Sequence, residues 1–270
     1  MKCLALPLLG VLAACGQQAG GEPVTRIDLD NPNKSAAPAP APTPTVASAC
    51  QTVTFEDAQL TDCVADPAKH RITTMLGNPP YRSLKAYAAA RPADAPKLAF
   101  AMNAGMFDDA GKPIGYYVRA GDRGHELNRA DGPGNFHMKP NGVFFGSGGR
   151  WQVMTADAFY SQVGDRPDFG TQSGPMLVVG GKLHPEITDD GPSKAIRNGV
   201  GVDSAGRAHF VISEGPVSFG KLARYFRDVV KAPYALYLDG SVSALWDPAT
   251  GRMDARAPIG PMLVVEEKSQ

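Results

Sequence analysis

Short apolar runs that end at glycine, proline or asparagine dominate this chain, and they limit what it can fold into. Runs of this length bounded by turn-forming residues are typical of β-strands. The clearest candidates are KLAFAMN (97–103), GYYVR (115–119), GVFF (142–145), MLVV (176–179), NGVGVD (198–203), AHFVIS (208–213), YALYLD (234–239) and MLVVEE (262–267).

Two segments instead repeat apolar residues at helical spacing. These are RSLKAYAAA (82–90) and SFGKLARYFRDVV (218–230), the second behind a Ser218 cap. Because strand candidates far outnumber helices, the sequence predicts the α+β class. We expect a single domain with an extensive mixed or antiparallel sheet, a few helices and a functional cleft at the strand ends.

The N-terminus has the layout of an export signal, with Lys2, a short apolar core and small residues before Cys15. The run LAAC is similar to a bacterial lipobox, so residues 1–15 are expected to be a lipoprotein signal peptide ending at lipidated Cys15. Residues 16–49, rich in Ala, Pro and Thr, are expected to be a disordered linker. We therefore expect a protein of the bacterial cell envelope, facing the periplasm and attached through this lipid to the inner or the outer membrane.

Residues 50–270 are long enough for one large domain, and no linker-like stretch interrupts them. Lys plus Arg and Asp plus Glu each number 27, which gives a formal charge of zero. Without a basic run, nucleic acid is not expected as a partner. Cys50 and Cys63 lie close in sequence, and in an oxidising periplasm we expect them to form a disulfide.

Polar residues recur where the predicted strands begin or end. Strand ends meet at the rim of a sheet, so these side chains can point into one cleft while the sheet holds them in place. Each alone is also a common turn residue that bonds local backbone. The candidates are Asn103, Gln172, Ser173, Arg197, Asn198 and Asp239.

The segments around these residues resemble the phosphodiester glycosidase family, from about Lys97 to the C-terminus. The resemblance identifies residues 50–270 as a phosphodiester glycosidase-like domain. It implies hydrolysis of the bond between a sugar's anomeric carbon and a phosphodiester oxygen. It rests on MNAGMF (102–107), GPGNFHMKPNGVFF (132–145), TQSGPMLVVGGKLHP (171–185), RNGVGVD (197–203), ISEGPVSF (212–219) and LDGSVSALW (238–246).

The chemistry of such a substrate suggests roles for these residues. A phosphodiester leaves as an anion without protonation, so one carboxylate and one cation are enough. Asp239 is the expected nucleophile or base, and Arg197 is expected to hold two phosphate oxygens. Glu214 is either a second catalytic carboxylate or a structural partner of an arginine. The predicted substrate-binding residues are Asn103, Gln172, Ser173, Asn198 and Ser241.

Two other functions stay open at this stage. One is a phosphodiesterase that attacks phosphorus, and the other is a non-catalytic envelope lipoprotein that binds anionic glycans. The sequence requires no cofactor, because its histidines and cysteines do not form a cluster with metal-ligand spacing. A divalent cation at Asp239 stays an option. The expected partners are a sugar phosphodiester or anionic glycan and, through Cys15, a membrane.

Overall fold

The computed structural model describes residues 47–268, and these residues form one compact unit. The predicted signal peptide, Cys15 and nearly all of the predicted linker lie outside the described residues. No helix among residues 47–268 is long and apolar enough to cross a membrane.

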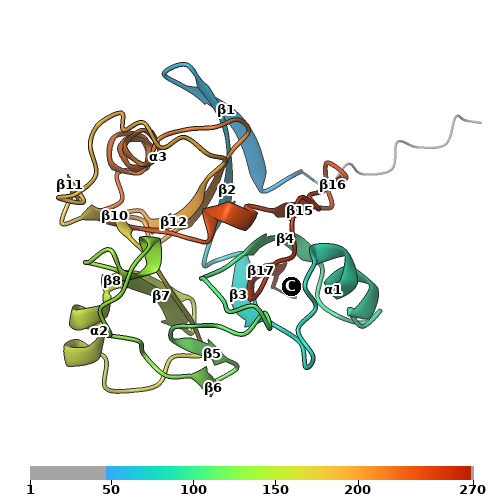
Figure 1. The fold of residues 1–270 in the computed structure, drawn as a ribbon. Coiled ribbons are helices and arrows are strands. Elements are labelled where there is room, and N and C mark those ends of the chain that lie inside the picture. The colour runs from blue at the N-terminus through green and yellow to red at the C-terminus, as the bar shows by residue number, and fades with distance from the viewer. Residues whose placement is uncertain (1–46, 269–270) are drawn as a thin grey trace, which may run out of the picture. The chain divides into compact units, whose positions relative to one another are not determined.

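The largest sheet has seven strands, and every neighbouring pair in it is antiparallel. It contains strands from the start, middle and end of the folded part of the chain (Figure 1). In spatial order they are β1 (Cys50–Phe55), β2 (Ala58–Ala65), β13 (Ala208–Ser213), β12 (Asn198–Val202), β14 (Tyr234–Tyr237), β10 (Met176–Val179) and β11 (Lys182–Leu183).

Two five-stranded sheets, also antiparallel, complete the fold. The first contains β16 (Arg252–Met253), β15 (Leu245–Asp247), β4 (Leu98–Asn103), β17 (Met262–Glu267) and β3 (His70–Met75). The second contains β6 (Asp122–His125), β5 (Tyr117–Arg119), β9 (Phe169–Ser173), β7 (Gly142–Ser147) and β8 (Arg150–Thr155). The α+β class is confirmed, with three separate sheets in place of one extensive sheet.

The three sheets share one central core, and a short helix packs on the face of each sheet that points away from this core. Side chains alternate between the two faces of a strand. On β13, Phe210 and Ile212 enter the central core while Val211 packs with the α3 residues. With both faces covered, such strands read as continuous apolar runs, which explains why the sequence signal was strong.

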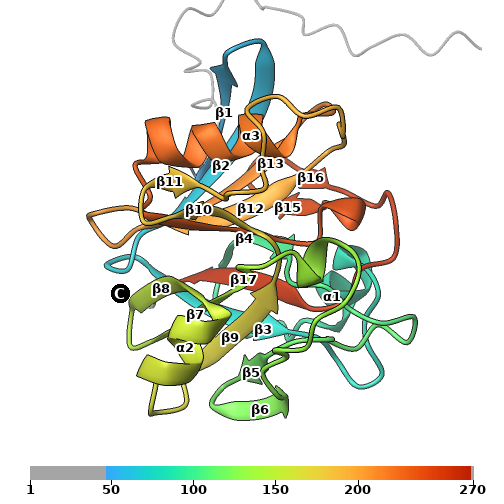
Figure 2. The same ribbon diagram turned by 60° about the vertical axis from the view of Figure 1, so that its left-hand side comes forward.

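The helices are short and lie one on each sheet (Figures 1 and 2). Leu84 of α1 packs on the β4–β17 sheet, Phe159 of α2 on the β7 sheet, and Leu222 of α3 on the seven-stranded sheet. They are α1 (Leu84–Ala90), α2 (Ala156–Gln162) and α3 (Phe219–Arg224), with two 3-10 turns, η1 (Asn135–His137) and η3 (Gly240–Val242), and one π-helix, η2 (Tyr225–Val230).

Both predicted helices are present with altered bounds. The first begins at Leu84 because Ser83 caps it, and its hydroxyl accepts a hydrogen bond from the Ala86 N–H. The second is capped by Ser218, as predicted, but becomes a π-helix after Arg224.

The N-terminal boundary of the folded part also differs from the prediction. The Ser48 hydroxyl donates to Asp247, and the Ala49 carbonyl accepts from the Val64 N–H, so these two residues already belong to the folded domain. Cys50 and Cys63 are paired residues of β1 and β2, and they form a disulfide.

Candidate active site

Asp239 lies just beyond the end of β14, where it caps the 3-10 turn η3. Its carboxylate accepts a hydrogen bond from the Ser241 N–H at 3.2 Å. Its backbone N–H donates to the Ala104 carbonyl, and its own carbonyl accepts from the Asn103 side chain at 2.8 Å. The side chain is half-buried, and this burial raises the pKa of the Asp239 carboxyl against the opposing hydrogen bond from Ser241. The result is a fixed carboxylate that is more basic than an ordinary aspartate.

A buried amide network holds the turn that carries Asp239. The side-chain oxygen of Asn103 accepts from Asn198 Nδ2 and from the Ala244 N–H, both at 2.9 Å. The Ser243 hydroxyl lies 3.2 Å from Asn198 Oδ1 and 2.9 Å from the Gly240 carbonyl oxygen. The structure therefore brings Asn103 and Asn198 to Asp239, but their amides bond protein groups and position the turn.

Arg197 is buried, and protein groups take up most of its guanidinium. Nε donates to the Val217 carbonyl at 2.9 Å, Nη1 to the Tyr237 hydroxyl at 3.1 Å, and Nη2 to the carbonyl and hydroxyl of Ser193 at 3.0 Å each. Its guanidinium carbon also lies 3.6 Å from the centre of the Phe219 ring. Since a guanidinium has five N–H donors, this arrangement leaves no pair of donors for the predicted two-oxygen contact with phosphate.

The charge of Arg197 has no acidic partner. Among residues 47–268, no carboxylate lies within ion-pair distance of this guanidinium, although only 3% of the residue is exposed. Buried charges in proteins are ordinarily paired, because removing an ion from water is unfavourable. An unpaired buried guanidinium is therefore a site that attracts an anion.

Tyr237 connects Arg197 to the Asp239 turn, and the sequence interpretation missed it. A Cβ atom added to Gly240 would lie 1.9 Å from the Tyr237 hydroxyl oxygen, so Gly240 is needed for this close packing. Burial raises the pKa of Tyr237, while the charge of Arg197 opposes that rise. The sequence did hold a signal for Tyr237. Side chains two positions apart on a strand lie on the same side, and Asp239 comes two positions after Tyr237.

Gln172 and Ser173 end β9, which belongs to a different sheet from β14. The Gln172 side-chain oxygen accepts from the N–H groups of Tyr116 and Asn128, both at 2.9 Å, and its Nε2 donates to the Asn128 carbonyl at 2.7 Å. The Ser173 hydroxyl is fully buried and has no hydrogen-bond partner among the described residues. Gln172 thus fixes a neighbouring loop, and its side chain makes no hydrogen bond to the Asn103 network.

Glu214 is a structural partner of an arginine, which is one of the two roles that the sequence left open. Its Oε1 accepts from the Thr61 hydroxyl at 2.7 Å and pairs with Arg252 Nη1 at 2.6 Å. Ser241, also predicted to bind substrate, is exposed, and its backbone N–H bonds Asp239. Of the two predicted carboxylates, only Asp239 lies next to the amide network.

No metal site is evident in the part of the chain that the structure describes. Residues 47–268 contain no group of three or more His, Cys, Asp or Glu side chains placed to hold an ion. Four cavities in this region do not include Asp239 in their walls. One of them, of about 320 Å³, is lined by Glu214 and by Val217, whose carbonyl holds Arg197.

The family of this chain is one of glycosidase-type hydrolases. The chain belongs to the phosphodiester glycosidase family, whose sequence model matches residues 96–266. The uncharacterized protein YigE of Escherichia coli strain K12 is 35% identical over 172 residues, which cover 64% of this chain and 67% of YigE.

Two solved structures share the fold at low sequence identity. One is the catalytic domain of zebrafish N-acetylglucosamine-1-phosphodiester alpha-N-acetylglucosaminidase, auto-inhibited by its pro-peptide. It is 14% identical, with a TM-score of 0.55 and coverage of 81% of this chain and 82% of that one. The other is a hypothetical protein from Synechocystis, also 14% identical, with a TM-score of 0.52 and coverage of 81% and 61%. Both comparisons concern the fold.

Proposed function

We propose that this protein hydrolyses the glycosidic bond of sugar-1-phosphodiesters with Asp239 as the catalytic carboxylate. The observation that carries this proposal is that a carboxylate and a guanidinium lie at the same end of the seven-stranded sheet. A half-buried carboxylate, Asp239, and an unpaired buried guanidinium, Arg197, are connected through Tyr237 and the turn that begins at Gly240. The family match supports the same reaction class.

In the proposed reaction the bond between the anomeric carbon and the phosphodiester oxygen breaks. The electron pair stays with that oxygen, which leaves as the anion of a phosphate monoester and needs no acid. Asp239 either takes a proton from the attacking water or attacks the carbon itself and is released by water in a second step. Its raised pKa suits the base role, because a more basic carboxylate accepts a proton more readily.

Arg197 has a revised role in this proposal. Because its donors are committed to Val217, Ser193 and Tyr237, it acts through its charge and by holding Tyr237. A fixed positive charge in a water-poor site stabilises negative charge that develops on the leaving oxygen. Asn103 and Asn198 are positioning residues for Asp239, and we propose no cofactor for the reaction.

We also propose that the enzyme works in the bacterial cell envelope. The N-terminal pattern ending at Cys15 supports a lipid anchor, and the Ala-, Pro- and Thr-rich composition of the predicted linker, residues 16–49, supports a spacer between that anchor and the catalytic domain. The substrate would then be a sugar phosphodiester or an anionic glycan that reaches the periplasm.

The test uses the full chain in detergent, ¹⁸O-labelled water and a panel of sugar-1-phosphodiesters, with the products read by mass spectrometry. We expect the label on the free sugar. Asp239→Asn should lower kcat at least about 100-fold, since a positioned base contributes that much or more. Glu214→Gln makes the same carboxylate-to-amide change and should keep its turnover.

Other outcomes would contradict the proposal. Label on phosphate would show attack at phosphorus and favour a phosphodiesterase. Undiminished turnover by Asp239→Asn would exclude Asp239 as the catalytic carboxylate. Binding without any product would favour a glycan-binding lipoprotein.

A further inference from the structure

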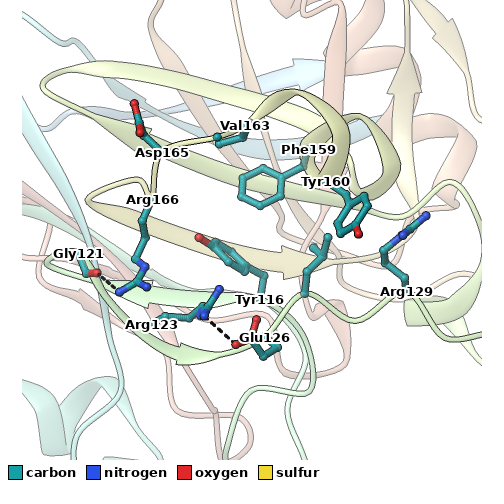
Figure 3. A pocket seen from close by; sticks show the side chains of 12 residues that line it. Tyr116, Gly121, Arg123, Glu126, Arg129, Phe159, Tyr160, Val163, Asp165 and Arg166 are labelled. Atoms are coloured by element: carbon teal, nitrogen blue, oxygen red, sulfur yellow. Dashed lines mark hydrogen bonds and ion pairs between the residues drawn. The ribbon is translucent and has the colours of Figure 1, made fainter.

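A second candidate site lies in a cavity of about 600 Å³ that does not involve Asp239 (Figure 3). It is formed by residues 116–129 on one side and by α2 with the following segment, residues 159–166, on the other. Its volume is in the range of small-molecule sites. Its lining includes the aromatic side chains of Tyr116, Phe159 and Tyr160 and the guanidinium groups of Arg123, Arg129 and Arg166.

One wall of this cavity is aromatic. The rings of Tyr116 and Phe159 pack with their centres 4.8 Å apart. Tyr160 is 66% exposed, although large apolar side chains of that exposure are rare among residues 47–268. The Arg129 guanidinium lies over its face, 4.2 Å from the ring centre. Exposed aromatic faces beside polar groups are suited to the apolar face of a sugar ring.

Another part of the cavity wall carries two arginines, Arg166 and Arg123, whose positive charges have few or weak partners. Arg166 donates one hydrogen bond, to the Gly121 carbonyl at 3.3 Å, and has no acidic partner among residues 47–268. Arg123 pairs with Glu126 at 2.9 Å, but both side chains are exposed. Exposed ion pairs contribute little stability, so a ligand can replace them. The Asp165 carboxylate also lines the cavity but points away from the Arg166 guanidinium (Figure 3).

The Tyr116 hydroxyl lies between these two walls. It makes no hydrogen bond to another described residue, and in Figure 3 it faces the space between Arg123 and Arg166. Burial raises the pKa of Tyr116, and the charges of the two arginines oppose that rise, as their closeness to the hydroxyl requires. The Tyr116 hydroxyl and the Arg166 guanidinium, which has unused donors, therefore face the same part of the cavity.

We propose that this cavity binds a negatively charged sugar unit. The ring would lie against Tyr160 and Phe159, and its carboxylate or phosphate would accept hydrogen bonds from Arg166 and the Tyr116 hydroxyl. The aromatic wall favours a sugar over a bare anion, and the arginines favour an acidic sugar over a neutral one. A concave site of this volume fits a small ligand rather than a protein surface.

The cavity is distinct from the Asp239 site but is held by the same framework. Gln172 accepts hydrogen bonds from the backbone of Tyr116 and of Asn128, which comes directly before Arg129. Gln172 thus holds the backbone at Tyr116 and next to Arg129, two residues that line the cavity. Because none of the lining residues belongs to the Asp239 network, binding here does not depend on the proposed hydrolysis.

Calorimetric titration of the full chain in detergent tests the proposal with glucuronate, glucose 6-phosphate, glucose and inorganic phosphate as probes. At least one acidic sugar should bind, about tenfold or more tighter than glucose, and glucuronate against glucose 6-phosphate identifies which acid group the site takes. Arg166→Gln should weaken that binding about tenfold or more. Tyr160→Ala should weaken it as well.

The controls separate this site from the catalytic one. Arg227→Gln makes the same change at an arginine outside the cavity that pairs with its neighbour Asp228, and it should leave binding unchanged. Asp239→Asn should also bind normally, so a failed hydrolysis assay does not affect the result. Unchanged affinity in Arg166→Gln, equal affinity for glucose, no binding of either acidic sugar, or binding of phosphate as tight as that of the sugars would each overturn the proposal.

Discussion

Replacing Asn103 by alanine is expected to destabilise the domain well beyond the loss of one surface contact. The Asn103 side chain is buried and makes three hydrogen bonds, to the Asp239 carbonyl, the Ala244 N–H and the Asn198 amide. In the variant the Ala244 N–H loses its partner. The Asp239 carbonyl keeps only a longer bond from Val242 N–H at 3.3 Å, and Asn198 Nδ2 keeps only a contact of 3.4 Å with the residue 103 carbonyl.

These losses set the size of the expected effect. A buried polar group left without its partner costs about 1–3 kcal/mol. With one group orphaned and two weakened, we expect the free energy of unfolding to fall by about 2–4 kcal/mol. That is a large part of the roughly 5–15 kcal/mol that holds a typical domain together.

Urea denaturation followed by circular dichroism measures this loss, provided the m-value is unchanged. The matched control is Asn135→Ala, because the Asn135 side chain is half-buried and makes no hydrogen bond to a described residue. It should change the unfolding free energy by less than about 0.5 kcal/mol. A loss below about 1 kcal/mol in Asn103→Ala, or one equal to the control, would refute the network as the support of the Asp239 turn.

Two further predictions concern buried groups. Burial disfavours protonation of His209, but the hydrogen bonds and charges of Asp62 and Asp203 together outweigh it, so the pKa of His209 is raised above the ordinary value. The stability that protonated His209 contributes should be complete below about pH 6.5 and should disappear as the pH rises through the folded-state pKa. The melting temperatures of wild type and His209→Gln should therefore converge toward about pH 9. A difference in melting temperature that widens with pH would contradict this. Gly240→Ala should destabilise by about 1–3 kcal/mol in urea because its methyl group overlaps the Tyr237 hydroxyl, whereas Gly215→Ala, with open space around the added methyl, should not; equal effects would exclude that overlap.

Strands buried on both faces were the most predictable part of the fold. AHFVIS (208–213) and MLVVEE (262–267) match β13 and β17 residue for residue, because the central core takes one face and a helix-covered core the other. By contrast, β1 at the edge of its sheet has Gln51 and Thr54 exposed, so its sequence carries no apolar run. The short helix α2 was missed for a related reason, since only Ala156 and Phe159 are buried on it.

The candidate site was predictable by position but not by role. Strand ends pointed to Asn103, Asn198 and Asp239, and hydrogen bonds bring these three together. Sequence patterns do not say where a side chain's donors go, and this is why Arg197 was expected to bind phosphate while its donors bond protein groups. Sequence patterns also do not show that Gln172 lies in a different sheet from Asp239, because polar residues at strand ends have the same pattern in every sheet.

The position of β17 determines when this protein can fold. This strand comes last among the described elements, yet it lies inside its sheet, between β4 and β3. While the chain is being synthesised, β3 and β4 have no partner for the facing edges that β17 later joins. Because β3 and β4 cannot pair with β17 before it has been made, the sheet closes only after synthesis has passed Glu267. A ribosome that stops just short of Met262 therefore leaves a gap inside a sheet, between β4 and β3.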